Sequence, residues 1–140
     1  MNEHNPIIVV DDDNDDLQLF KDACKELKIP NELIMFGSGQ ALLEHFDKLG
    51  DPPFLIVCDF NLPGMNGLKL RKTIMADPYL RYKSVPYLIW TTGPTEPQVR
   101  DAYEHMVQGF FMKPPSFEEL RTMVSSIVDY WKISIHPTKN

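Results

Sequence analysis

The stretches IIVVDDDNDD at residues 7–16 and FLIVCD at residues 54–59 decide the fold of this chain. In each, a short run of β-branched or aliphatic residues stops abruptly at acidic side chains. Apolar runs of this kind are typical of strands that are buried on both faces of a parallel sheet. The carboxyl ends of such strands form the ligand crevice of an open α/β sheet. We therefore expect Asp11, Asp12 and Asp59 to meet at one edge of a sheet.

The remainder of the chain alternates between strand-like and helix-like patterns. Apolar runs at residues 32–36, 85–90 and 109–112 predict three more strands. Between the runs, apolar residues recur at helical spacing, and Ser38, Thr95 and Ser116 are expected to cap helices. The five stripes are Leu17, Phe20, Cys24 and Leu27; Leu42, Leu43, Phe46 and Leu49; Leu68, Leu70 and Ile74; Val99, Ala102, Tyr103 and Met106; and Leu120, Met123, Val124, Ile127, Val128 and Trp131. This alternation predicts a doubly wound α/β fold with five parallel strands and five flanking helices.

Length and composition limit the classes of function. The 140 residues suit one domain, with a core over about residues 6–131 and a tail at 133–140. The net charge of −6 without a basic cluster argues against a nucleic-acid surface. No apolar stretch approaches the roughly 20 residues of a membrane span, and no signal peptide precedes the first strand, so we expect a cytoplasmic protein that does not bind membranes. Cys24 and Cys58 are expected to be reduced core residues.

The acidic cluster at residues 11–16 contains five aspartates and one asparagine. Carboxylates this close repel one another and raise each other's pKa, and a divalent cation such as Mg²⁺ relieves the conflict. Asp13, Asp15 and Asp16 are explained by the preference of aspartate for a helix N-terminus. Asp11 and Asp12 lie at the strand end instead, which makes them the candidate metal ligands.

Three further strand ends carry groups that suit phosphoryl chemistry. Asp59 could simply cap the loop at residues 60–64, but beside Asp11 and Asp12 it is a candidate nucleophile that forms an aspartyl phosphate. Thr91 and Lys113 end the fourth and fifth strands and can offer a hydroxyl and an ammonium to the same group. Taken alone, a threonine at this position is usually just a β-forming residue, and a lysine is usually solvated. The predicted convergence of Thr91 and Lys113 with Asp59 favours a phosphoryl-binding site instead.

Four short motifs connect these residues to a known family. They are VVDDD at residues 9–13, DFNLPGMNG at 59–67, WTT at 90–92 and MKP at 112–114. Together they resemble the receiver domain of two-component response regulators over about residues 6–131, and the ending resembles stand-alone receivers of the phytochrome-associated type. The resemblance implies a flavodoxin-like fold with strand order 2-1-3-4-5.

The resemblance also implies a role for each residue of the pocket. Asp59 would accept a phosphoryl group from a histidine kinase or a phosphotransfer protein. Asp12 would bind Mg²⁺ directly, with Mn²⁺ as a possible substitute, Asp11 would act through water, and Asn61 would offer its backbone carbonyl. Lys113 would bind the phosphoryl group, with a cis peptide before Pro114. The domain would catalyse only its own phosphorylation and dephosphorylation, so it would not be an enzyme acting on other molecules.

A switch is implied as well. Thr91 would move towards the acyl phosphate, and Phe110, at a position where tyrosine is frequent, would fill the space that it leaves. The face formed by the fourth helix, fifth strand and fifth helix would then bind a downstream protein or a second copy, since we expect no output domain after Trp131. Trp131 alternatively closes the core beneath the last helix. Gly93 stands where many members place a longer polar side chain, which leaves the lifetime of the phosphoryl group open.

Three other readings of the chain compete with this one. A Mg²⁺-dependent phosphatase of the haloacid-dehalogenase class would place a second acid two residues after its nucleophile, where this chain has Asn61. A phosphorylation-independent interaction module would not need the five competent pocket residues. A flavodoxin-like cofactor binder would carry a loop rich in Ser, Thr and Gly after the first strand. The acidic loop at residues 11–16 does not fit that last class.

Overall fold

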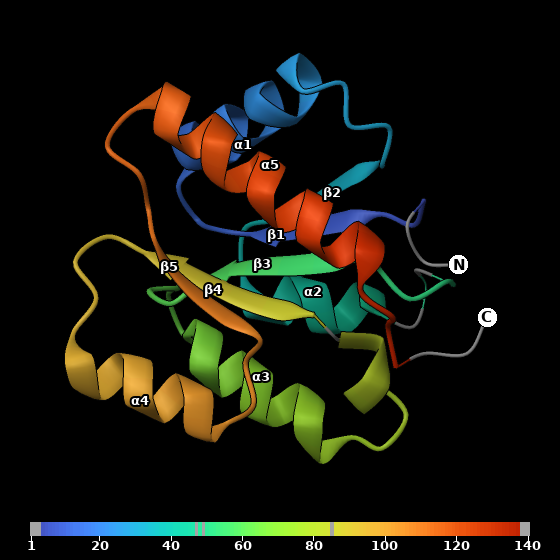
Figure 1. The fold of residues 1–140 in the computed structure, drawn as a ribbon. Coiled ribbons are helices and arrows are strands. Elements are labelled where there is room, and N and C mark those ends of the chain that lie inside the picture. The colour runs from blue at the N-terminus through green and yellow to red at the C-terminus, as the bar shows by residue number, and fades with distance from the viewer. Residues whose placement is uncertain (1–3, 47, 49, 85, 138–140) are drawn as a thin grey trace.

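A parallel sheet forms the centre of the molecule, as the sequence predicts. The structure, a computed structural model, describes residues 4–46, 48, 50–84 and 86–137. The strands follow the predicted order β2-β1-β3-β4-β5 (Figure 1). They are β1 (Ile7–Val10), β2 (Leu33–Phe36), β3 (Leu55–Asp59), β4 (Tyr87–Thr91) and β5 (Gly109–Met112). β1, β3 and β4 are buried throughout, which explains their uninterrupted apolar sequences.

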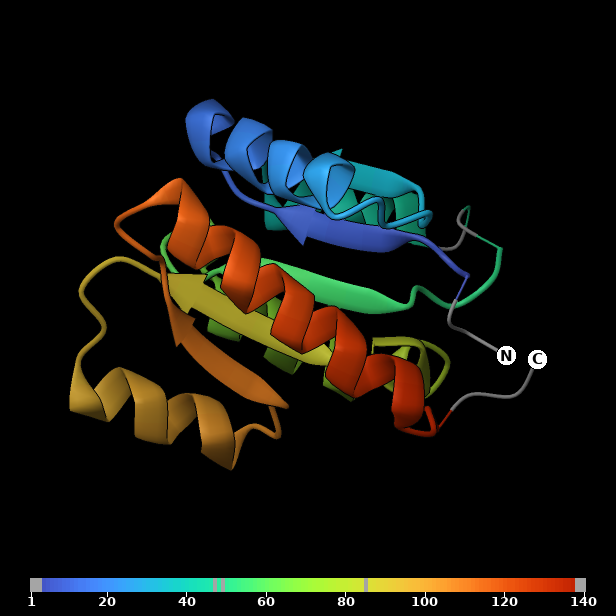
Figure 2. The ribbon, with the colours of Figure 1, turned by 45° about the horizontal axis from the view of Figure 1, so that its top comes forward.

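Helices cover both faces of the sheet. They are α1 (Asn14–Glu26), α2 (Gly39–Phe46), α3 (Gly67–Ala76), α4 (Glu96–Glu104) and α5 (Phe117–Ile133). α1 and α5 pack on one face, and α2, α3 and α4 pack on the other (Figures 1 and 2). Each layer therefore encloses its own apolar core against the sheet. Within the described residues, none of the helices has the length and apolar character needed to cross a membrane.

The predicted helix caps are present. Thr95 and Gln98 form a reciprocal capping box at the start of α4. Ser116 accepts a hydrogen bond from the Glu119 backbone at the start of α5, and Ser38 accepts one from Ala41. Cys24 and Cys58 are buried free thiols, as expected.

Several predicted boundaries differ from the structure. α4 ends at Glu104, and Met106, expected in its apolar stripe, adopts a left-handed φ of 65° and is exposed. Asp59 is the last residue of β3 rather than the first after it, because it pairs with Trp90 of β4. The sequence pattern also missed a 3₁₀ helix at Arg81–Ser84. Leu49 and Val85, expected in the second helix and the fourth strand, lie outside the described residues.

The segment after α5 returns to the sheet. His136 Nε2 lies 2.9 Å from the carbonyl oxygen of Phe54, and the two rings are 5.4 Å apart. Trp131 is half-buried against the same core, with its ring 6.0 Å from that of His136. Trp131 thus closes this end of the core, as one of its two interpretations expects. Residues 138–140 of the expected tail lie outside the described residues.

Candidate functional site

Three carboxylates converge at the carboxyl edge of the sheet. Asp11, Asp12 and Asp59 each offer an oxygen, and these oxygens all lie within 4.8 Å of one another. The parallel register of β1 and β3 places Val10 beside Cys58, so the acids that follow these two residues become neighbours. Asp11 and Asp59 are buried, whereas Asp12 faces solvent. The predicted convergence of the three acids is confirmed.

The loops that follow the strands fix the two buried carboxylates. Asp11 Oδ1 accepts a hydrogen bond from the backbone N–H of Asp13, 2.9 Å away. Asp13 in turn caps α1 by accepting from the backbone of Asp15 and Asp16. Asp59 Oδ1 accepts from the backbone N–H of Asn61 at 3.0 Å. One oxygen of each buried acid is therefore held by main chain, which orients the other oxygen.

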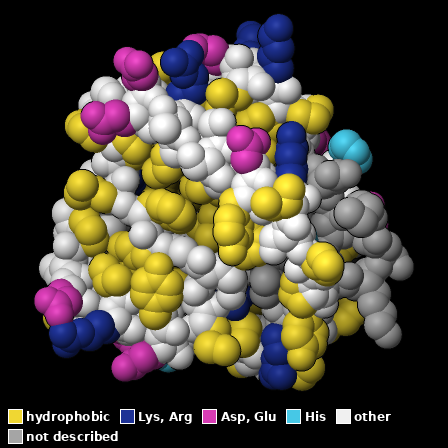
Figure 3. Space-filling view, viewed as in Figure 1, with side chains coloured by type: hydrophobic (Ala, Val, Ile, Leu, Met, Phe, Trp, Pro, Cys, Tyr) yellow, Lys and Arg dark blue, Asp and Glu magenta, His cyan; other side chains and the backbone are white. Residues whose placement is uncertain are grey.

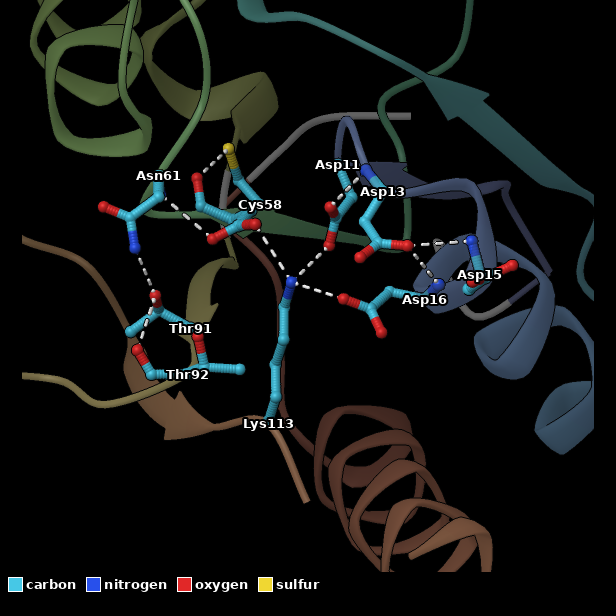
Figure 4. A network of polar contacts seen from close by, with 10 residues as sticks. Asp11, Asp13, Asp15, Asp16, Cys58, Asn61, Thr91, Thr92 and Lys113 are labelled. Atoms are coloured by element: carbon cyan, nitrogen blue, oxygen red, sulfur yellow. Dashed lines mark hydrogen bonds and ion pairs between the residues drawn. The ribbon is translucent and has the colours of Figure 1, made fainter. Parts of the chain in front are cut away.

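Lys113 occupies the centre of this arrangement (Figure 4). It follows β5, and its Nζ atom lies 2.9 Å from Asp11 Oδ2 and 2.9 Å from Asp59 Oδ2. Its third partner is Asp16 Oδ2, at 2.7 Å. The ammonium also lies 5.0 Å from the centre of the Trp90 ring, within the range of a cation–π contact. Lys113 is thus a nearly buried cation shared among three carboxylates.

Asp16 is a pocket residue that the sequence analysis missed. Its place in the first turn of α1 was explained by the helix N-terminus alone, which is too narrow an explanation. α1 begins at the edge of the pocket, so a side chain in its first turn can point back towards the sheet (Figure 4). The sequence did offer a signal: Asp16 follows Asp11 and Asp12 by only a few residues, and Lys113 was expected to enter the same pocket.

Burial and charge shift two ionisation equilibria in opposite ways. Burial raises the pKa of Asp11 to about 6, although the backbone N–H of Asp13 and the ammonium of Lys113 oppose the shift. Burial disfavours the charge of Lys113, but its charged contacts with Asp16, Asp11 and Asp59 outweigh this effect and hold the pKa of Lys113 above the usual value. Lys113 therefore stays an ammonium at neutral pH.

Thr91 points into the pocket from the end of β4. Its hydroxyl oxygen accepts a hydrogen bond of 2.8 Å from the side-chain amide of Asn61. The sequence analysis assigned Asn61 a role for its backbone carbonyl, and the structure adds this side-chain contact. It connects the loop after β3 to the end of β4. The threonine hydroxyl also lies 3.5 Å from the carbonyl oxygen of Thr92, to which it can donate (Figure 4).

Phe110 lies beside the pocket rather than in it. It is half-buried on β5, and its ring centre is 6.2 Å from that of Phe60, the residue after Asp59. Gly93 follows Thr91 by two residues in a left-handed conformation with a φ of 60° and is exposed. Space that a longer side chain would occupy at this position is thus open towards solvent.

The donor set of the pocket suits a hard divalent cation. Asp11 Oδ2 has an ion-pair partner in Lys113, but the two groups are not aligned for a hydrogen bond, and this buried oxygen lacks a hydrogen-bond donor among the described residues. A cation that takes six or more oxygen ligands would satisfy it. Carboxylate oxygens are the protein ligands that Mg²⁺ and Mn²⁺ prefer. The residues present therefore fit such an ion.

Comparison with known proteins agrees with this geometry. A family model described as the response regulator receiver domain matches residues 7–125. The response regulator Rcp1 of Synechocystis sp. is 31% identical over 137 residues, which cover 92% of each chain. Its solved Mn(2+)-bound form has a TM-score of 0.80 at 28% identity, covering 94% of this chain and 98% of that chain. The phosphorylated cyanobacterial phytochrome response regulator RcpA shares the fold, with a TM-score of 0.85 at 23% identity over 96% of this chain and 99% of that chain.

Proposed function

Because this chain belongs to the receiver domain family of two-component response regulators, we propose that Asp59 is the residue that accepts the phosphoryl group. The family consists generally of signalling proteins rather than enzymes that act on other molecules. The observation that carries the proposal is the shared position of Lys113, 2.9 Å from both Asp11 and Asp59. An ammonium held there can move to a phosphoryl oxygen once Asp59 is phosphorylated.

Asp12, Asp59 and the backbone carbonyl of Asn61 are the proposed direct ligands of Mg²⁺, and Asp11 is proposed to bind the ion through water. When bound, the ion would neutralise charge on the phosphoryl oxygens during transfer. The mutual distances of the three carboxylates support this assignment, and so does the buried Oδ2 of Asp11, which pairs with Lys113 without a hydrogen bond. Mn²⁺ is a reasonable substitute, since a solved form of Rcp1 contains it.

In the proposed transfer, a carboxylate oxygen of Asp59 attacks phosphorus. The phosphorus–nitrogen bond to a phosphohistidine of the donor protein breaks, and its electron pair stays on the imidazole nitrogen. The main-chain hydrogen bond from Asn61 orients the attacking carboxylate, since it occupies Oδ1 and leaves Oδ2 towards Lys113. Hydrolysis of the acyl phosphate would later restore the free carboxylate, and open space at Gly93 gives water access.

The proposed output is a change of partner affinity on the face that carries α4, β5 and α5. Thr91 would donate to a phosphoryl oxygen, and Phe110 would move inwards beside Phe60. To shift the protein from mostly inactive to mostly active, phosphorylation must favour the active conformation by roughly 5 kcal/mol of interaction free energy. A few charge-assisted hydrogen bonds at about 1.5–3 kcal/mol each can supply it.

This face already presents exposed apolar side chains. Figure 3 shows hydrophobic groups gathered over it, and Tyr103, Met112 and Tyr130 are among the exposed ones. A downstream protein or a second copy of the chain would bind here. A histidine kinase or a phosphotransfer protein is the proposed donor, and the cis peptide before Pro114 and the cytoplasmic location stay predictions.

A labelling experiment tests the assignment of Asp59. The protein is incubated with Mg²⁺ and either acetyl phosphate or phosphoramidate, and intact mass is measured before and after base treatment. Wild type and the exposed-acid control Asp51→Asn should each gain a single base-labile phosphoryl adduct, whereas Asp59→Asn should gain none. Labelling of Asp59→Asn at the wild-type level would contradict the proposal. Sustained turnover of many phosphomonoesters would instead favour the phosphatase.

A further inference from the structure

We propose that Asp16 is a positioning residue that retains Lys113 in the pocket when a divalent cation displaces its ammonium from Asp11 and Asp59. The inference rests on the proposed function, in which those acids and Asp12 bind the cation. It assigns a role to an acid in the first turn of α1 that lies outside the proposed ligand set.

Competition between the cation and Lys113 follows from which oxygens are already occupied. In both buried acids Oδ1 accepts a backbone N–H, from Asp13 in one case and Asn61 in the other. In both, Oδ2 faces the ammonium of Lys113 at 2.9 Å. A cation that enters must therefore share or take the oxygens that Lys113 now uses.

Repulsion between the divalent ion and the ammonium of Lys113 then prevents both from occupying the same oxygens. Asp11, Asp12, Asp16 and Asp59 carry four negative charges, and Lys113 carries one positive charge, so the pocket attracts a divalent ion. Once the ion is bound, it repels the ammonium at short range. Lys113 needs another anionic partner at that point, or it exchanges its pocket contacts for water.

Asp16 is placed to be that partner. Its contact with Lys113, at 2.7 Å, is the shortest of the three ion pairs. The exposed fraction of the Asp16 side chain is 26%, against 10% for Lys113, so Asp16 lies on the solvent side of the pocket. The Trp90 ring, 5.0 Å from the ammonium, offers a second surface that favours a cation. Lys113 can thus withdraw from Asp11 and Asp59 by a short movement and still remain next to the phosphoryl position.

The competing explanation is that Asp16 attracts the cation only through its negative charge and not through its contact with Lys113. A matched variant distinguishes these two explanations. Asp15 lies in the same first turn of α1 and is exposed, and it contributes a similar charge near the pocket. Lys113 forms ion pairs with Asp11, Asp16 and Asp59. Asp15→Asn therefore removes one negative charge near the pocket and its favourable interaction with the N-terminus of α1. Asp16→Asn removes the same two effects and also the ion pair with Lys113.

The test is calorimetric titration of the whole chain with MgCl₂, without a phosphodonor, at pH 8. Asp16 is one of three anionic partners of Lys113 without the ion but its remaining one with the ion bound, so loss of the contact should weaken the metal-bound state more than the metal-free state. We expect the Kd of Asp16→Asn to rise about tenfold, against about twofold or less for Asp15→Asn. In a Lys113→Met background, the two substitutions should change the Kd equally, because no ammonium remains to be held.

Equal effects of Asp16→Asn and Asp15→Asn in the wild-type background would overturn the inference. So would an undiminished effect of Asp16→Asn in the Lys113→Met background. Either result leaves the proposed function intact if wild type binds Mg²⁺ and is labelled on Asp59. Failure of wild type to bind Mg²⁺ would overturn both.

Discussion

Gly67 is the position where a single added methyl group tests how tightly the phosphoacceptor strand is held. It is the first residue of α3 and follows the cap Asn66. A Cβ atom at this position would lie 2.5 Å from the carbonyl oxygen of Asp59 and 3.2 Å from the Asp59 carbonyl carbon. These are backbone atoms, so a change of rotamer cannot relieve the overlap in Gly67→Ala.

The surrounding hydrogen bonds prevent a simple retreat of the helix. Gly67 N–H donates to the carbonyl oxygen of Phe60 at 3.0 Å, and the Tyr87 hydroxyl donates to the Gly67 carbonyl oxygen at 2.7 Å. Overpacking of this kind costs about 1–3 kcal/mol. The higher helix propensity of alanine offsets up to about 1 kcal/mol. We therefore expect Gly67→Ala to lower the free energy of unfolding by about 2 kcal/mol.

The same overlap should disturb the chemistry, because the strand end must shift. Misplacement of a reacting group by about 1 Å can cost on the order of 100-fold in rate. A shift of a few tenths of an ångström should then slow phosphorylation of Asp59 by acetyl phosphate about tenfold. Urea unfolding gives the stability, and time-resolved mass spectrometry of the adduct gives the rate.

Gly37→Ala is the matched control. Apart from Gly37 and its two chain neighbours, no described residue has an atom within 4 Å of the added Cβ, and Gly37 does not have a positive φ. Both the free energy of unfolding and the phosphorylation rate should therefore stay at wild-type values. If Gly67→Ala unfolds within about 0.5 kcal/mol of wild type and phosphorylates at the same rate, the reasoning from backbone overlap is wrong.

Two further predictions concern buried charges. The pKa of Asp11 is raised to about 6 in the folded chain, so the folded state binds this proton more tightly than the unfolded state. In metal-free buffer, wild type should therefore lose up to about 3 kcal/mol of stability relative to Asp11→Asn as the pH rises from about 4 to 7, and parallel urea-unfolding curves across that range would refute this. Arg71 is buried and donates to the Ser84 carbonyl and hydroxyl and to the Met106 carbonyl. Arg71→Met should lower the free energy of unfolding by about 3 kcal/mol, whereas the exposed neighbour Lys72→Met should change it by less than about 0.5 kcal/mol, and similar midpoints for the two would contradict the structure.

The strands and the acidic end of the sheet could be predicted from the sequence because local pattern determines both. An apolar run that lacks polar alternation, such as residues 7–10, must be buried on both faces. Parallel pairing then brings residues that follow two such runs to the same edge. Asp11 and Asp59 could be placed together for that reason, and so could Thr91 once its strand was identified.

Contacts that depend on the path of a loop could not be predicted in this way. Asp16 meets Lys113 across 97 positions of sequence, and that contact depends on the angle at which α1 leaves the sheet. The end of α4 was also missed, because apolar periodicity continues to Met106 although the backbone turns left-handed there. The burial of Arg71 depends on the 3₁₀ helix Arg81–Ser84, whose sequence shows no periodic signal.

The amide–hydroxyl contact between Asn61 and Thr91 has a mechanical consequence. A hydroxyl group can accept one hydrogen bond and donate another at the same time. Thr91 can therefore exchange its 3.5 Å contact with the Thr92 carbonyl oxygen for an incoming anion, while its oxygen keeps the hydrogen bond from the amide of Asn61. The loops that follow β3 and β4 would then move together, and a displacement that starts at one strand end would reach the other through the retained hydrogen bond between Asn61 and Thr91.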